Sequence, residues 1–138
     1  MIIMSVDYGD VRTGVAVCDK NEILASPVTV ITEKDADVLI EKIICLANER
    51  NVQMFVVGLP KNMDGSEGFR AQACREFSEK LSEKSGIPAE LYDERLTTVS
   101  AHNALNMTNT RGKKRKAVVD AVSAVMILED YMASRKPR

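Results

Sequence analysis

The chain has 138 residues, of which 45% are hydrophobic and 28% charged, and its formal net charge is -1. This composition excludes a disordered chain, and the charge balance excludes a surface that is basic overall. Any contact with a nucleic acid therefore depends on a local basic segment. We expect one domain over residues 1–138, because this length builds a single core of ordinary size.

The number and spacing of the cysteines indicate the redox environment of the protein. Cys18, Cys45 and Cys74 lie far apart and show no metal-binding spacing, so we expect structural thiols. An odd number argues against a disulfide framework and suits a reducing environment. The start of the chain lacks a signal-peptide pattern, and no apolar run is long enough to span a bilayer. We expect a soluble, cytoplasmic protein with no membrane partner.

Two apolar runs around a short turn open the chain. Residues 2–6 read as a buried strand, and residues 15–17 return as a second strand. Gly9 and Gly14 permit the tight reversal between them. Asp7 stands where the first strand ends. A carboxylate in that place is unfavourable unless a cation or hydrogen bonds offset its desolvation, so the sequence sets an acid at the edge of a sheet.

Strands and helices alternate along the rest of the chain. The expected elements are strands over 24–31, 52–58 and 89–94, and helices over 36–49, 67–85, 97–106 and 117–133. Pro27 fits best near the start of its strand or at a sheet edge. A core stripe is predicted at Phe69, Ala73, Phe77 and Leu81. This order predicts a three-layer α/β domain with a five-stranded mixed sheet, in which an antiparallel hairpin is followed by βαβ units.

Three acidic positions are not required by the local structure: Asp7, Asp93 or Glu94, and Asp120 on an apolar helix. Each has an alternative explanation. Asp7 could cap a turn, and Asp93 and Glu94 could be charges at a helix start. Asp120 could be a buried acid that pairs with Arg12 or Lys116. Carboxylates brought together repel, and a divalent cation removes that penalty. Oxygen ligands select Mg²⁺ or Mn²⁺, and two such ions can activate a water and clamp a phosphodiester.

Two polar segments are candidate nucleic-acid contacts. The loop over 58–68 follows a buried strand and is longer and richer in Gly than a plain connection requires. The segment over 111–116 carries five cationic residues in six positions. Lys and Arg side chains there could hold a phosphate backbone. An ordinary connection and a solvated charge run remain the alternatives.

At these residues the chain resembles a known family. The matching blocks are Asp7-x-Gly9 with Gly14-Val15-Ala16, residues 57–66 (VGLPKNMDGS), residues 93–98 (DERLTT) and residues 114–128. They resemble the YqgF/RuvX family, whose members are described as candidate pre-16S rRNA nucleases or Holliday-junction-resolvase-like proteins. The resemblance covers essentially the whole chain.

The resemblance implies an RNase H-like fold and a metal-dependent endonuclease that trims the 5′ end of pre-16S rRNA during ribosome biogenesis. It implies that Asp7, Glu94 and Asp120 are both the catalytic and the metal-binding residues, with Mg²⁺ or Mn²⁺ as cofactor. The preference for Glu94 over Asp93 comes from the resemblance alone. The candidate nucleic-acid-binding residues are Arg12, Lys61, Asn62, Arg95, Arg111, Lys113, Lys114, Arg115 and Lys116.

Other functions remain open at this point. A Holliday junction resolvase would act on branched DNA as a dimer, but true resolvases carry an additional acid on the last helix. Here the positions one turn either side of Asp120 are Lys116, Ala117, Ser123 and Ala124. A non-catalytic nucleic-acid-binding ribosome-assembly or transcription factor is the third reading. The expected partner is RNA, and a monomer and a homodimer are both compatible with the sequence.

Overall fold

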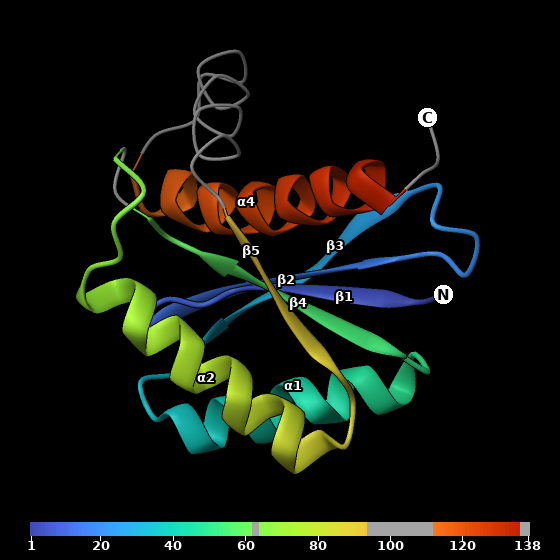
Figure 1. Cartoon of the computed structure of the whole chain (residues 1–138), viewed down its shortest axis with the longest axis horizontal. Helices are drawn as coiled ribbons and strands as arrows, with labels where there is room; N and C mark the ends of the chain where they lie inside the picture. The colour runs from blue at the N-terminus through green and yellow to red at the C-terminus, as the bar shows by residue number, and fades with distance from the viewer. Residues whose placement is uncertain (62–63, 94–111, 136–138) are drawn as a thin grey trace.

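A five-stranded mixed sheet forms the centre of this computed structural model, which describes residues 1–61, 64–93 and 112–135. Its strands are β1 (Ile3–Asp7), β2 (Arg12–Cys18), β3 (Ala25–Thr32), β4 (Met54–Leu59) and β5 (Ala89–Asp93). They lie in the order β3-β2-β1-β4-β5 (Figure 1). The first three strands pair antiparallel, whereas β1, β4 and β5 are parallel. The predicted mixed sheet is confirmed.

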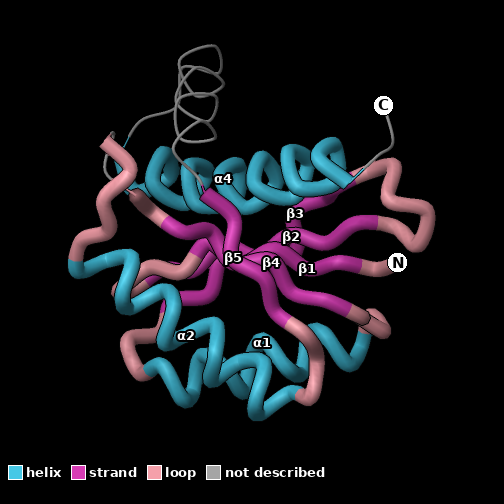
Figure 2. Tube along the Cα trace, viewed as in Figure 1, coloured by secondary structure: helices cyan, strands magenta, loops and turns pink. Residues whose placement is uncertain are grey.

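Helices cover both faces of this sheet, as Figure 2 shows. α1 (Ala36–Glu49) and α2 (Phe69–Ser85) lie on one face, and α4 (Gly112–Arg135) lies on the other. The side chains of residues 112–121 are outside the description. The helix predicted over 97–106 falls on residues that the structure does not describe. Within the described ranges, no helix combines the length and apolar character needed to cross a bilayer.

Strand β1 contributes to two cores because its side chains alternate between faces. Met4 and Val6 pack with residues of α1 and α2, whereas Ile3 packs with residues of α4. Strand β4 is buried along its whole length and pairs parallel on both sides. Its continuous apolar run therefore predicted its central position correctly.

Local signals placed several elements well. α1 has the predicted bounds, and the Asp35 side chain caps it by accepting from the backbone N–H groups of Asp37 and Val38. Pro27 lies on the edge strand β3, next to a register shift at Val15/Ala16 of β2. Both observations fit a residue that cannot donate to a central ladder.

The start of the last helix differs from the prediction. α4 begins at Gly112 rather than near 117, so the cations at 113–116 are helical. Lys and Arg have good helix propensity, and a charge run is therefore compatible with a helix as well as with a loop. As a result Asp120 lies two turns inside α4 rather than in its opening turns.

One prediction about burial is wrong. Phe69 was expected in the core stripe of α2, yet it is 91% exposed, whereas Phe77 and Leu81 are buried. A four-residue step overshoots one helical turn by about 40°, so two steps back from Phe77 turn Phe69 by about 80° away from the core. Cys45 is exposed on α1, unlike the buried Cys18 and Cys74. The residues on either side of it in the sequence are apolar and pack against the core, whereas Cys45 lies on a different face of the helix.

Candidate active site at the carboxyl edge of the sheet

Asp7 is the last residue of β1 and stands at the edge where the parallel strands end, at the left of Figure 1. It pairs with Gly14 of β2 and is half-buried. By alternation it shares the α4 face of the sheet with Ile3 and Ser5. The structure therefore confirms the predicted place of this acid at the end of a buried strand.

Helix α4 runs antiparallel to β1 across that face. The Ser5 hydroxyl donates to the backbone carbonyl of Ala124 over 2.6 Å in a buried hydrogen bond. Further along the helix, the Tyr131 hydroxyl lies 3.7 Å from the sulfur of Met54, which is level with Ile3 at the start of the strands. The N-terminal half of α4 therefore lies toward the carboxyl edge, where Asp7 stands.

This arrangement brings the backbone of Asp120 level with Asp7. Asp120 precedes Ala124 by one helical turn, a rise of about 6 Å. Asp7 follows Ser5 by two strand residues, which is about 6.6 Å in the same direction. The Ser5–Ala124 bond thus places the backbones of Asp7 and Asp120 at the same level along β1. The side chain of Asp120 is outside the description.

Strand β5 leads to the two candidate acids Asp93 and Glu94. Tyr92 meets Tyr131 of α4 edge to face at 6.1 Å, and Glu90 accepts a hydrogen bond from the Tyr131 hydroxyl. Leu91 packs on the opposite face, with residues that contact α1 and α2. Asp93 ends the strand, and alternation assigns it to the face of Leu91. Asp93 therefore does not share the face of Asp7, and Glu94 lies outside the described residues.

Glycine separates the ends of β1 and β5. Val6 is level with Val57 of β4, so Gly58 comes next to Asp7, and Gly58 is itself level with Tyr92. Two inter-strand spacings of about 4.8 Å separate β1 from β5. Gly58 therefore places no side chain between Asp7 and Tyr92.

The turn after Asp7 depends on a close backbone approach. A Cβ on Gly9 would lie 2.0 Å from the carbonyl oxygen of Arg12, so no other residue fits without moving the turn. The Gly9 N–H donates to the Thr13 hydroxyl over 3.3 Å. The predicted role of Gly9 in the reversal is confirmed, and its cause is contact rather than a left-handed conformation.

The predicted phosphate-binding cations lie partly within the description. Arg12 begins β2, and Lys61 follows β4 by two residues, so both are at the carboxyl edge. A hydrogen bond from Arg75 lowers the pKa of Glu67, and the charge of Lys61 lowers it further. Residues 113–116 form the start of α4, at the same edge. Asn62, Arg95 and Arg111 fall on residues that are not described.

The donor set suits a hard divalent cation, since the candidate ligands are all carboxylates. Asp7 supplies one such group at the sheet edge, and Asp93 faces away from it. Within the described parts of the chain there is no group of three or more possible metal ligands. The carboxylates of the other two predicted ligands, Glu94 and Asp120, are outside the description.

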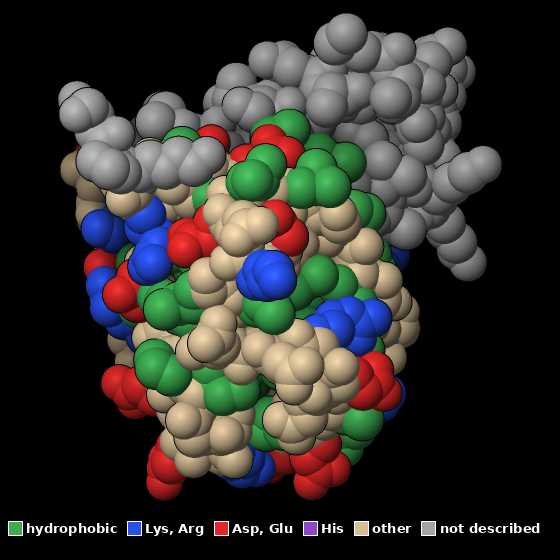
Figure 3. Space-filling model, turned by 90° about the vertical axis from the view of Figure 1, so that its right-hand side faces the viewer, with side chains coloured by type: hydrophobic (Ala, Val, Ile, Leu, Met, Phe, Trp, Pro, Cys, Tyr) green, Lys and Arg blue, Asp and Glu red, His purple; other side chains and the backbone are tan. Residues whose placement is uncertain are grey.

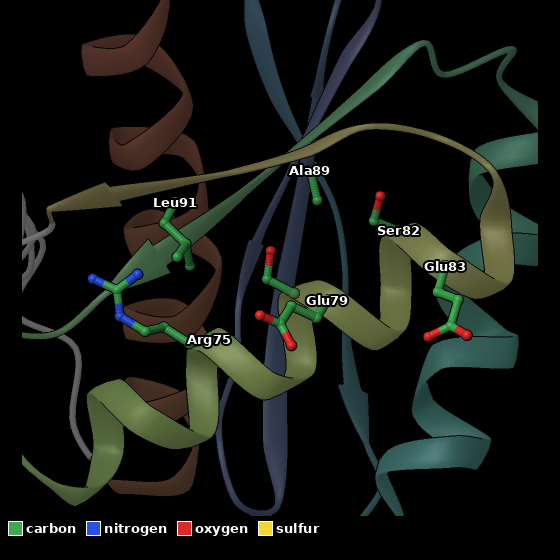
Figure 4. Close-up of a pocket in the computed structure, with 7 residues that line it drawn as sticks. Arg75, Glu79, Ser82, Glu83, Ala89 and Leu91 are labelled. Carbon is green, nitrogen blue, oxygen red and sulfur yellow. The ribbon is translucent and has the colours of Figure 1, made fainter.

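One cavity in the described part of the chain is separate from this edge. It has a volume of ≈ 440 Å³ and lies between α2 and β5 (Figure 4). Its lining residues are Arg75, Ser78, Glu79, Ser82, Glu83, Ala89 and Leu91. Leu91 points away from α4, so this cavity opens on the opposite face from Asp7.

Figure 3 shows the end of the molecule where the N-terminus lies, and there both signs of charge are interspersed.

Sequence reasoning missed one residue beside the candidate site. Arg70 donates to Asp10 over 2.7 Å and also to the backbone carbonyl of Tyr8, the residue after Asp7. The sequence contained a local signal for Arg70. A cation in the first turn of a helix opposes the macrodipole, so helix stability does not explain its position.

Comparison with known protein families identifies the family of this chain. A sequence profile described as "RuvX: Holliday junction resolvase" matches residues 1–134. The chain belongs to the RuvX family. A relative from Lachnospira eligens is 43% identical over 142 residues, covering 99% of both chains. One from Rhodopirellula baltica is 42% identical over 140 residues, covering 99% of this chain and 79% of its own length. Both are named "Putative pre-16S rRNA nuclease".

Solved structures show the same fold at low sequence identity. RuvC from Thermus thermophilus, in complex with a Holliday junction substrate, gives a TM-score of 0.62 at 12% identity and covers 100% of this chain and 99% of its own. The fowlpox virus Holliday junction resolvase gives 0.58 at 13% identity, covering 97% and 99%. The expected RNase H-like fold is confirmed, and the RuvX family assignment places the chain among phosphodiester hydrolases.

Proposed function

We propose that this RuvX-family protein is a divalent-metal-dependent endonuclease that cleaves RNA and processes the 5′ end of pre-16S rRNA in the cytoplasm. The observation that carries the proposal is the level placement of Asp7 and the Asp120 backbone, which follows from the Ser5–Ala124 hydrogen bond. Full-length relatives named for pre-16S rRNA support the choice of substrate.

Asp7, Glu94 and Asp120 would hold Mg²⁺ or Mn²⁺. The exclusion of Asp93 from the α4 face favours Glu94 as the third ligand. Bound divalent cations supply Lewis-acid stabilisation of the attacking and leaving oxygens of a phosphodiester.

The cations at the same edge would position the RNA backbone. Arg12 and Lys61 flank the strand ends, and Asn62, Arg95 and Arg111 extend the set along the chain. Lys113, Lys114, Arg115 and Lys116 stand at the start of α4. Cations at a helix N-terminus oppose the macrodipole, so helix stability does not account for them, whereas phosphate binding does.

Cleavage of branched DNA is the competing function, since the family profile is described as a Holliday junction resolvase. A resolvase resembling RuvC would carry a further acid one turn from Asp120, but Ser123 and Ala124 follow it on α4. The fully buried Ala124 contacts Ser5 instead. We therefore favour RNA, and a dimer that presents two sites would be required only by the DNA function.

The deciding experiment is a parallel cleavage assay. Labelled RNA with the 16S 5′ flank and a four-way DNA junction are each incubated with Mg²⁺, Mn²⁺ or a chelator. We expect wild type to cut the RNA only with metal, and Asp7→Asn to lower the rate by at least about 100-fold, the size typical of losing a group that stabilises transition-state charge.

Asp19→Asn is the matched control. Asp19 lies at the opposite edge and accepts from the backbone N–H groups of Ile23 and Leu24, which an amide oxygen can still do. This variant should cut at the wild-type rate. Unchanged cleavage by folded Asp7→Asn would contradict the proposal. Cutting of the junction alone would identify a resolvase, and RNA binding without turnover would indicate an assembly factor.

A further inference from the structure

Arg70, in the first turn of α2, reaches across to the turn that follows Asp7. Its Nη1 donates to the Asp10 carboxylate over 2.7 Å, and its Nη2 donates to the backbone carbonyl of Tyr8. The guanidinium carbon also lies 5.2 Å from the centre of the Tyr8 ring. One side chain therefore holds the turn on both sides of Gly9.

Tyr8 is held by α2 a second time, through its ring. The ring stacks on Phe77 with centres 4.2 Å apart and planes 7° apart. Burial raises the pKa of the Tyr8 hydroxyl, and the charge of Arg70 partly offsets this rise. Since Tyr8 directly follows Asp7 in the chain, the backbone of Asp7 cannot rotate without disturbing these contacts.

Stability does not explain the Arg70 contacts. The Asp10 side chain is 83% exposed and that of Arg70 is 37% exposed. Ion pairs of this kind contribute about 0–1 kcal/mol to folding. The macrodipole of α2 also disfavours a cation in its first turn. What the guanidinium supplies is geometry, because its planar fork fixes two acceptors relative to each other.

We propose that Arg70 is a positioning residue that holds the turn from Asp7 to Asp10 in the conformation that binds a divalent cation. This inference rests on the proposed function, in which Asp7 is a metal ligand. Groups that orient metal ligands commonly change affinity by 10–100-fold when they are removed. Loss of Arg70 should therefore weaken cation binding much more than it weakens folding.

The test measures Mn²⁺ binding to the full chain by titration calorimetry, without nucleic acid, for wild type, Arg70→Gln and Arg70→Lys. We expect Arg70→Gln to weaken Mn²⁺ affinity by about tenfold or more while its thermal midpoint stays close to that of wild type. Lysine keeps the charge but not the fork, so Arg70→Lys should recover only part of the affinity.

A second readout does not depend on any metal. In metal-free protein, Arg70→Gln should speed amide hydrogen exchange across residues 8–13, which include the Gly9 N–H bonded to Thr13, and leave exchange in α1 unchanged. If Arg70→Gln exchanges the amide hydrogens of this segment at the wild-type rate, the positioning role is overturned, whether or not the proposed function holds.

Arg135 provides a matched control at the other edge of the sheet. It donates to Glu22 over 3.0 Å, lies 5.6 Å from the centre of the Tyr131 ring, and its side chain is 35% exposed. Arg135→Gln removes the same kinds of contact and should leave Mn²⁺ affinity unchanged. Equal losses in Arg70→Gln and Arg135→Gln would overturn the proposal.

Asp7→Asn separates this inference from the function on which it rests. If Asp7→Asn loses Mn²⁺ binding and Arg70→Gln does not, the positioning role fails and the metal site stands. If Asp7→Asn binds Mn²⁺ as wild type does, the proposed metal site fails. Absence of Mn²⁺ binding by wild type would overturn both.

Discussion

Individual carboxyl groups of this protein differ according to what surrounds them. Backbone N–H groups of Leu24 and Ile23 bond to Asp19 and hold its pKa below the usual 3.8. Burial raises the pKa of Asp130 on α4 above that value. Folding thus favours the charged form of Asp19 and disfavours that of Asp130.

Asp130→Asn is expected to raise the thermal midpoint at pH 7. A carboxyl whose pKa is raised by folding destabilises the folded state above that pKa, and the effect disappears once the pH falls below its unfolded value. The gain should therefore be absent near about pH 3. Asp19→Asn should instead lower the thermal midpoint at pH 7. Thermal unfolding at both pH values checks this, and an equal gain at both would contradict the pKa explanation.

For helix α2, the sequence predicted the position along the chain correctly, but it assigned Phe69 to the buried face wrongly. The sequence placed this helix to within two residues of its observed start, and Gly86 ends it in a left-handed conformation with φ 71°. Its buried residues are Ala71, Cys74, Phe77, Ser78 and Leu81. Ala71, Cys74, Ser78 and Leu81 follow one another in steps of three, four and three residues, which keep to one face, and Phe77 lies beside them. A run of four-residue steps instead drifts around the helix.

The two phenylalanines of α2 should respond very differently to truncation. Phe77→Ala should lower the free energy of unfolding by about 3–5 kcal/mol, because it leaves a cavity in the core and removes the stacking partner of Tyr8. Phe69→Ala should change it by less than about 0.5 kcal/mol, because that side chain is exposed. Urea unfolding measures both. A loss of similar size in the two variants would contradict the burial assignment.

For the whole molecule, the docking of α4 decides which part of this helix lies level with Asp7. The helix packs on β1, β2, β3 and β4, and the Ser5 hydroxyl fixes its position along β1 through Ala124. Near the other end, Tyr131 reaches Glu90 and Met54. Two separate contacts thus fix both the direction of α4 and its position along the strands, and with them the level of Asp120.

Ser5→Ala should lower the free energy of unfolding by roughly 1 kcal/mol, because it removes a buried hydrogen bond between β1 and α4. Ser134→Ala is the control, since that hydroxyl donates over 2.7 Å to the carbonyl of Tyr131 from an exposed residue. It should change stability by less than about 0.5 kcal/mol. Urea unfolding again provides the measurement, and equal effects would contradict a docking role for Ser5.

The sequence by itself determined the strands, the bounds of α1, the mixed sheet and the place of Asp7. These depend on short-range causes: apolar alternation, the Asp35 cap, and glycines at a turn. The family resemblance added the fold name and the choice of Glu94, which residue spacing left open.

Tertiary structure alone decided which side of each element faces the core and which distant groups meet. The exposure of Phe69, the face of Asp93 and the level of Asp120 all depend on how helices and strands pack. Arg70 meets Asp10 from 60 residues away, and Ser5 meets Ala124 from 119 residues away. Local propensity carries no information about such pairs, because they form only when the sheet has brought the elements together.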